Sequence, residues 1–266
     1  MPATEYNTRK RISLGQDNNA LTWLLILNAV VFAILIFIRV VYLLEDGDDK
    51  LLTAAFRQDI LSWFVLPASA SELLYKPWTI LTYMFTHFDV WYIISNMLWL
   101  WCFGYILQDL AGNNKLIPIY IYGGLTGALI FSLSANLIPS LSGRVSELEP
   151  LIGAGPSVIA IAVATTALAP NYRIFPLLNG GIPLWVLTLV FIAIDLTTVG
   201  SGNAAVALAH ITGACTGFFF VQQLRLGRDL GAWMPKFAGW VNDLFNPEKK
   251  HVAAKVSEQH FYKATR

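Results

Sequence analysis

The stretch LIGAGPSVIAIA, residues 151–162, joins a run of small residues to an apolar sequence of helical character. Proline is favoured in the first turn of a helix, so Pro156 predicts that a helix begins beside it. Ser157 then lies at the mouth of an apolar helix, where a serine nucleophile could act, whereas Gly155 occupies the tightest position. Two alternatives follow, a catalytic Ser157 or a catalytic site whose nucleophile is missing.

The composition of the chain indicates whether water or lipid surrounds the folded protein. Of the 266 residues, 56% are hydrophobic and 13% are charged, and the mean hydropathy is +0.55. Soluble domains carry about 25% charged residues, so we expect an integral protein of the lipid bilayer. The net charge of +1 argues against a nucleic-acid partner. Cys102 and Cys215 lie in apolar surroundings, which favours packing roles over a disulfide or a metal site, and no cofactor is expected.

Apolar segments of bilayer-spanning length recur along the chain and predict an all-α membrane protein. Six transmembrane helices are predicted, at residues 21–44, 90–107, 116–137, 153–168, 183–199 and 204–224. The membrane domain is expected over residues 21–224, between a cytoplasmic N-terminal tail (1–20) and a partly amphipathic cytoplasmic C-terminal tail (225–266). Residues 51–67 mix apolar and polar side chains, which predicts an interfacial helix in the first extracytoplasmic loop. The fourth and fifth spans are short, and such spans are tolerated where their ends are buried in protein or face a water-filled cavity.

Six spans place both termini on one side of the membrane, and the basic residues indicate which side that is. Loops on the cytoplasmic side carry an excess of Lys and Arg. The basic residues on the side of the two tails are Arg9, Lys10, Arg11, Lys115, Arg173, Arg225 and Arg228. The opposite side holds the acidic segment 45–49, together with Lys50, Arg57, Lys76 and Arg144. We therefore expect both termini in the cytoplasm.

His210 is an ionisable residue at the depth of the membrane, where its burial is costly unless it is paired or wetted. It lies three residues before Gly213, and Gly217 follows four residues later, so the three share roughly one helix face. Glycines at this spacing let a neighbouring helix approach closely. His210 is then either a buried hydrogen-bonding residue or a proton-transfer group. Gly123 and Gly127 form a similar packing face in the third span.

Asn96 lies in the middle of the second span. A buried Asn usually links helices through hydrogen bonds, and the functional alternative is donation to a developing oxyanion. Tyr92 precedes Asn96 by four residues and shares its face.

Three further polar residues are weaker candidates. Asp195 is expected near the extracytoplasmic end of the fifth span, either wetted or bonded to Thr197 or Thr198, with a proton relay as the functional alternative. His87 and Asp89 precede the second span, where structural hydrogen bonding is expected.

Four segments occur in a characteristic order along the chain: PWTILTYMFTHF at 77–88, NMLWLW at 96–101, GA at 153–154, and AH at 209–210 followed by the glycines at 213 and 217. Together they resemble the rhomboid family of intramembrane serine proteases. The most similar branch carries an APNYRI segment, seen here at 169–174. The resemblance runs from about residue 21 to about residue 230 and covers all six predicted spans.

This resemblance implies a six-helix rhomboid bundle in a bacterial cytoplasmic membrane, with a water-filled cavity open to the extracytoplasmic side. In the family, a serine at the start of the fourth helix attacks a substrate transmembrane segment, and a histidine on the sixth helix acts as general base. A histidine and an asparagine on the second helix hold the oxyanion with backbone N–H groups. By position, His210 matches the base, Asn96 the oxyanion asparagine and His87 the first histidine of the second-helix motif.

Two positions depart from the family pattern. The segment that ordinarily carries the serine reads GAGPS at 153–157, which puts Gly155 at the nucleophile position, and Tyr92 stands at the position of the oxyanion histidine. Two residues along a helix turn a side chain by about 200°, so Ser157 is expected to point away from the direction of residue 155. Pro156 at the first helical position further predicts Gly155 as the N-cap.

These departures favour a pseudoprotease that binds transmembrane segments of client membrane proteins without cleaving them. The first alternative is an active intramembrane serine protease that uses Ser157 with His210. A second alternative is a small-solute transporter that uses Asp195 and His210, although the two halves of the chain show no repeat and the spans hold few charges.

Overall fold

The computed structural model describes residues 19–44, 49–174, 181–198 and 203–245. The described chain is mostly helical, as the sequence predicts, and it divides into two compact units, residues 1–221 and residues 222–266. The predicted tail segment 1–20 lies almost wholly outside the described residues, as does the chain beyond residue 245.

Four helices of the described chain are long and apolar enough to cross a membrane. They are α1 (Ala20–Leu43), α5 (Val90–Ala111), α6 (Leu116–Leu137) and α10 (Ala204–Arg225). The predicted fourth and fifth spans form the shorter apolar helices α8 (Gly155–Leu168) and α9 (Leu184–Thr198). The 14 residues of α8 extend about 21 Å at the helical rise, less than the ~30 Å of a hydrocarbon core.

Short elements fill the connections between the long helices. They are α2 (Asp49–Asp59), η1 (Leu61–Trp63), α3 (Ala70–Tyr75), α4 (Thr79–Thr82), η2 (Tyr83–Phe85), η3 (Asn113–Lys115), α7 (Pro139–Ser142) and η4 (Val145–Glu147). The helix expected over residues 51–67 is shorter than predicted, because α2 ends at Asp59 and the chain continues through η1.

The described chain also contains a short pair of strands. Strands β1 (Arg173–Ile174) and β2 (Ile182–Pro183) pair antiparallel, with Arg173 opposite Pro183. The pair lies between α8 and α9, and the hydrogen bond from Leu184 N to Tyr172 O, 2.8 Å long, extends it to the start of α9.

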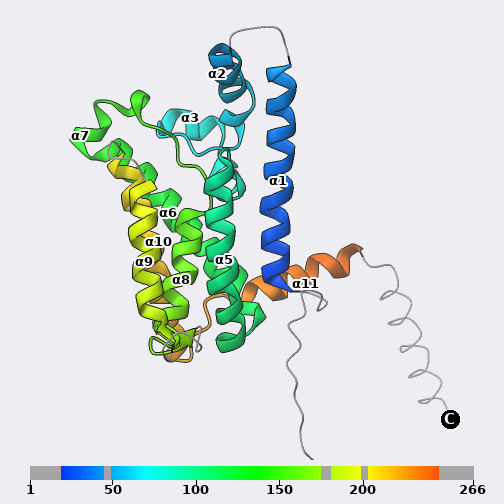
Figure 1. Cartoon of the computed structure of the whole chain (residues 1–266), viewed down its shortest axis with the longest axis vertical. Coiled ribbons are helices and arrows are strands. Elements are labelled where there is room, and N and C mark those ends of the chain that lie inside the picture. The colour runs from blue at the N-terminus through cyan, green and yellow to red at the C-terminus, as the bar shows by residue number, and fades with distance from the viewer. Residues whose placement is uncertain (1–18, 45–48, 175–180, 199–202, 246–266) are drawn as a thin grey trace, which may run out of the picture. The chain divides into compact units, whose positions relative to one another are not determined.

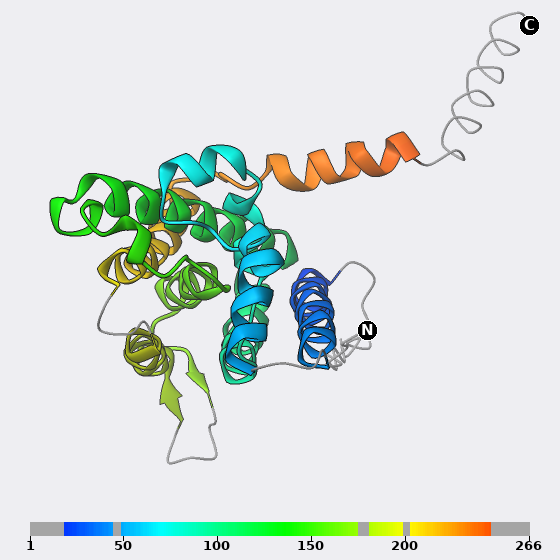
Figure 2. The same cartoon turned by 90° about the horizontal axis from the view of Figure 1, so that it is seen from above.

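Helix α8 is the central element of the first unit. It contacts α5, α6 and α9, and the view from above shows it surrounded by neighbouring helices (Figure 2). All residues from Gly155 to Ala162 are buried. A helix that is apolar on every side can be covered by other helices or by lipid, and the first half of α8 is covered by other helices. Helix α1 lies at the edge and contacts α5 and α2 (Figure 1).

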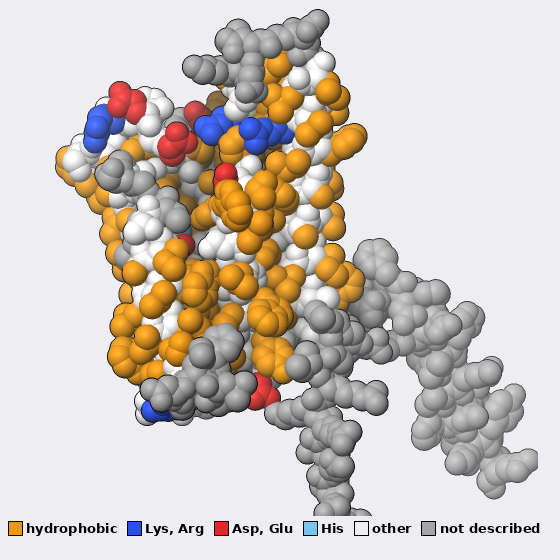
Figure 3. Space-filling model, in the orientation of Figure 1, with side chains coloured by type: hydrophobic (Ala, Val, Ile, Leu, Met, Phe, Trp, Pro, Cys, Tyr) orange, Lys and Arg blue, Asp and Glu red, His pale blue; other side chains and the backbone are white. Residues whose placement is uncertain are grey.

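The outer surface of the helices is apolar. Ile34 and Phe37 on α1, Ile94 and Leu98 on α5 and Leu189 on α9 are exposed. On the face drawn in Figure 3, hydrophobic side chains cover most of the middle, and charged side chains gather towards the two ends. A bilayer solvates such a surface, and water does not. The chain is therefore an integral membrane protein.

The second unit contains α11 (Trp233–Phe245). Four of its large apolar side chains are exposed and share one helix face, those of Trp233, Phe237, Trp240 and Leu244.

Candidate functional site

The loop before α8 is fixed on both sides. Leu151 and Leu66 exchange two backbone hydrogen bonds, of 2.9 and 3.0 Å. Gly153 donates its N–H to the carbonyl of Tyr83 at 3.0 Å. Gly153 has a φ of +91°, and a β-carbon there would collide with the ring of Tyr92. Only glycine meets both demands, so the strained turn brings the start of α8 against α5.

The N-cap of α8 is Ala154, and Gly155 is already helical. The prediction of Gly155 as the cap was therefore wrong by one residue. The first N–H groups of a helix have no intrahelical acceptor, so Pro156 is tolerated throughout the first turn and does not by itself fix where the helix begins.

Gly155 faces His210 across the α8–α10 contact. A β-carbon added at Gly155 would lie 2.8 Å from Nε2 of His210, closer still to its Cε1, and 3.1 Å from the hydroxyl of Tyr92. The sequence placed these three residues at one site, and the fold brings them together. Gly155 thus lies where a side chain would contact both the imidazole and the phenol.

His210 is held from its other side by Asp195. Its Nδ1 is hydrogen-bonded to Oδ2 of Asp195 on α9. His210 is 1% exposed and Asp195 is 5% exposed. The sequence predicted that Asp195 is wetted or bonds Thr197 or Thr198; the structure instead shows its side chain buried against His210, while Thr197 Oγ1 bonds the Ile194 carbonyl of its own helix.

Ser157 is buried on the side of α8 that faces α6. A β-carbon added at Gly124 would lie 2.7 Å from its Oγ, and Met84 packs at the same place. Among the described residues the Ser157 hydroxyl has no hydrogen-bond partner. Its direction differs from that of position 155, as the helical rotation predicts.

Asn96 and Tyr92 lie one turn apart on α5. The Nδ2 of Asn96 donates to the Tyr92 carbonyl at 2.9 Å, while its Oδ1 has no partner within the described chain. One amide hydrogen of Asn96 is therefore used inside the helix.

His87 supports the loop before α8. Its side chain is fully buried, and its Nε2 accepts the N–H of Ala154 at 3.3 Å. Burial lowers the pKa of His87 to about 4, so the ring is neutral at pH 7 and Nε2 is a competent acceptor. Asp89 is the N-cap of α5 and accepts from Tyr92 N at 2.9 Å.

Four glycines allow the helices around α8 to approach it closely. On α10, β-carbons at Gly213 and Gly217 would collide with the Pro156 and Ala160 carbonyls of α8. On α6, β-carbons at Gly123 and Gly127 would lie against Ala160 and Pro156. Positions 155 and 210 face each other because the backbones of α8 and α10 are in contact.

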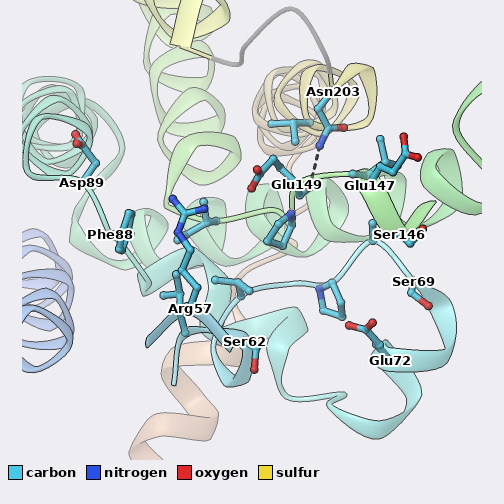
Figure 4. A pocket seen from close by; sticks show the side chains of 18 of the residues that line it. Arg57, Ser62, Ser69, Glu72, Phe88, Asp89, Ser146, Glu147, Glu149 and Asn203 are labelled. Atoms are coloured by element: carbon cyan, nitrogen blue, oxygen red, sulfur yellow. Dashed lines mark hydrogen bonds between the residues drawn. The ribbon is translucent and has the colours of Figure 1, made fainter. Parts of the chain in front are cut away.

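A cavity of about 1170 Å³ opens beside the site, and its lining includes residues of α2, α3 and η4 (Figure 4). Tyr92 lines both the cavity and position 155. The charged residues that line it are Arg57, Glu72, Asp89, Glu147 and Glu149. Asn203, at the start of α10, closes one side by donating to the Glu149 carbonyl at 2.8 Å.

The arrangement can orient a base but offers it no nucleophile. Nε2 of His210 has no hydrogen-bond partner among the residues that the structure describes, and it faces a residue without a side chain. Within the same residues, no group of three or more His, Cys, Asp and Glu side chains would hold a metal ion.

Sequence reasoning missed the pairing of Asp195 with His210. The available signal was an isolated carboxylate in an apolar span, which requires a buried partner. Spacing alone did not identify that partner, because residues 195 and 210 lie on different helices.

Comparison with known proteins agrees with these features. Residues 75–225, more than half of the chain, match the Rhomboid domain. This range includes Tyr92, Asn96, Gly155, Asp195 and His210.

The chain is similar to curated proteins from plants, animals and bacteria. RHOMBOID-like protein 12, mitochondrial, of Arabidopsis thaliana is 27% identical over 158 residues, which are 56% of this chain and 47% of that protein. Presenilin-associated rhomboid-like protein, mitochondrial, of Mus musculus is 23% identical over 239 residues, 87% of this chain and 53% of that protein. Rhomboid protease GlpG of Klebsiella pneumoniae is 28% identical over 120 residues, 44% of this chain and 40% of that protein. The matches span about half the length of these relatives, and the domain match shows that the chain belongs to the rhomboid family.

Proposed function

We propose that this protein is a rhomboid pseudoprotease, which binds transmembrane segments of client proteins and does not cleave them. The observation that carries the proposal is the glycine opposite His210. A serine protease needs a hydroxyl within hydrogen-bonding reach of its base, and Gly155 supplies none.

The proposed topology has six spans, with the short helix α8 crossing inside the bundle and the short helix α9 at its surface. The complete burial of the first half of α8 supports this, since its ends need not reach lipid. Helix α2 is proposed to lie in the interface. The distribution of basic residues supports cytoplasmic termini. We place the chain in a bacterial cytoplasmic membrane by its likeness to bacterial rhomboid proteases, although mitochondrial relatives also match.

The client is proposed to bind where the cavity meets the bundle. Trp91 and Tyr92, at the start of α5, line the cavity, and Trp91 is 78% exposed. A transmembrane segment that enters there would meet the apolar face of α5 within the membrane and the polar groups of the cavity at the membrane surface. A membrane-spanning chain likewise has an apolar middle and polar ends.

The two alternatives have less support. A protease using Ser157 requires its hydroxyl near His210, whereas Ser157 packs against Gly124 and Met84. A transporter using Asp195 and His210 requires both groups to meet solute, whereas they are buried and bonded to each other.

The experiment compares wild type, Gly155→Ser and Ser157→Ala in proteoliposomes with a fluorophosphonate probe and a fluorescent single-span protein. Wild type and Ser157→Ala are expected to show neither labelling nor cleavage. Gly155→Ser is expected to label, and addition of His210→Gln to abolish that labelling. Wild-type labelling that disappears in Ser157→Ala would overturn the proposal in favour of the first alternative.

Client binding needs a separate measurement. A donor dye on Cys215, the exposed one of the two cysteines, reports energy transfer to an acceptor on the single-span protein. We expect transfer above that given by the same dye on an unrelated membrane protein. Transfer equal to that background argues against client binding, and solute flux that Asp195→Asn abolishes would favour a transporter.

A further inference from the structure

We propose that Asp195 is a positioning residue for His210, so that the chain keeps two members of a Ser-His-Asp arrangement around position 155. This proposal rests on the proposed function, because the Asp195–His210 pair is what a protease site without its nucleophile retains. The hydrogen bond between Asp195 and His210 joins α9 to α10, and it can be measured without any enzymatic activity.

Asp195 and His210 form a buried pair. Asp195 is 5% exposed and His210 is 1% exposed. A carboxylate in such surroundings is retained only when it is paired or hydrogen-bonded. The imidazole Nδ1 of His210 supplies such a bond.

The bond to Asp195 also determines which ring nitrogen of His210 carries the hydrogen. An ionised carboxylate only accepts hydrogen bonds, so the shared hydrogen belongs to Nδ1 of His210. The lone pair of a neutral ring then lies on Nε2. That atom is buried and has no partner within the described chain, and it faces position 155. A second hydrogen bond of this kind is the usual means by which proteins select one nitrogen of a histidine.

In the part of the chain that the structure describes, Nδ1 of His210 bonds Asp195 and Nε2 has no hydrogen-bond partner. Thr197 Oγ1 bonds its own helix, and His87 bonds Ala154. Asn96 Nδ2 bonds the Tyr92 carbonyl. The orientation of His210 therefore depends on Asp195, which lies on a different helix from position 155.

A restored nucleophile shows what the pair can do. In Gly155→Ser the introduced hydroxyl would transfer its proton to Nε2 while its oxygen attacks the phosphorus of a fluorophosphonate. The P–O bond forms, the P–F bond breaks, and fluoride leaves, with the proton passing from the imidazolium to solvent. Asp195 stabilises that imidazolium through Nδ1. The ring must shift slightly, because the new β-carbon approaches Cε1.

The first test is nuclear magnetic resonance of the full chain in lipid nanodiscs with 15N-labelled histidine. The chain has four histidines, and His210→Gln identifies the signals of His210. We expect the wild type to carry its hydrogen on Nδ1, and Asp195→Leu to shift the tautomer towards Nε2–H. Asp195→Glu should keep the wild-type pattern, as should Asp59→Leu, which removes an exposed carboxylate on α2. A wild-type His210 with an unprotonated Nδ1, or an unchanged pattern in Asp195→Leu, overturns the proposal, and the wild-type spectrum decides even if a variant does not fold.

The second test measures fluorophosphonate labelling in the Gly155→Ser background. Adding Asp195→Leu is expected to slow labelling at least about tenfold, since loss of the third member of a triad costs far more in natural proteases. Asp195→Glu should recover part of the rate, and Asp59→Leu should leave it unchanged. Equal rates with and without the carboxylate overturn the positioning role. Labelling of the wild type bears on the proposed function instead, and if Gly155→Ser does not label, the tautomer measurement decides.

Discussion

A β-carbon added at Gly155 would lie 2.8 Å from Nε2 of His210. The same β-carbon would lie 3.1 Å from the hydroxyl of Tyr92. A buried base and a hydrogen-bond donor thus converge on a residue that has no functional group. The helices that create this convergence, α5, α8 and α10, are held together by close glycine contacts, so the geometry persists without the nucleophile.

Replacing Tyr92 by His in the Gly155→Ser background is expected to increase the labelling rate by about tenfold or more. The Tyr92 hydroxyl lies beside position 155. A histidine side chain is shorter than tyrosine, so its ring N–H would have room to donate to the oxyanion that forms on the attacked probe. One oxyanion donor contributes about 10²–10³ in rate in serine proteases, of which a grafted residue recovers part. Time courses of fluorophosphonate labelling check the change.

The matched control for this prediction is Tyr92→Phe in the same background. It removes the hydroxyl but keeps the ring that packs beside His87, whose centroid is 5.8 Å away. A rate for Tyr92→His no greater than that for Tyr92→Phe would show that position 92 does not serve the oxyanion.

Gly217→Ala is expected to destabilise the protein by about 1–3 kcal/mol, the usual cost of overpacking. A β-carbon at residue 217 would collide with the carbonyl of Ala160 and lie 2.9 Å from its Cα. These are backbone atoms of α8, so no side-chain rotation relieves the contact. Thermal unfolding in detergent micelles measures the loss. Gly143→Ala is the control, since its nearest atom would be 3.8 Å away, and an equal effect of both variants would contradict the packing argument.

The sequence predicted the helices and the residues that face each other at the site, Gly155 and His210. It predicted less well which polar side chains are hydrogen-bonded to each other. Composition and hydropathy predict long apolar helices because those signals depend only on local residues. The family pattern places Gly155 and His210 in register. Asp195 and the cap at Ala154 were missed, since one depends on the rotation of α9 against α10 and the other on a first turn that tolerates proline at more than one position. The strand pair β1–β2 is only two residues long on each side, too short for any periodic signal.

The stability of the protein is expected to fall between about pH 6.5 and about pH 4. Burial lowers the pKa of His87 from 6.5 to about 4, so the unfolded chain binds a proton in this range that the folded chain refuses. Unfolding is then favoured as the pH falls, by up to about 3 kcal/mol once the folded pKa is reached. Thermal unfolding of wild type and His87→Gln across this range measures the effect.

His87→Gln is a suitable comparison because its amide oxygen can still accept the N–H of Ala154. The variant should show a flatter dependence on pH over the same interval. Curves that stay parallel for the two proteins would assign the pH dependence to other groups.

Ser157→Ala is expected to leave the protein as stable as the wild type or to stabilise it by up to about 1 kcal/mol. The hydroxyl is fully buried and has no partner among the described residues, and removal of an unsatisfied polar group relieves its desolvation penalty. Thermal unfolding measures the stability, with Thr165→Val as the contrasting variant. The Thr165 hydroxyl is buried and bonds the Ile161 carbonyl at 2.6 Å, so its removal should destabilise. A loss in Ser157→Ala as large as in Thr165→Val would mean that Ser157 has a partner, and a partner at His210 would reopen the case for a serine protease.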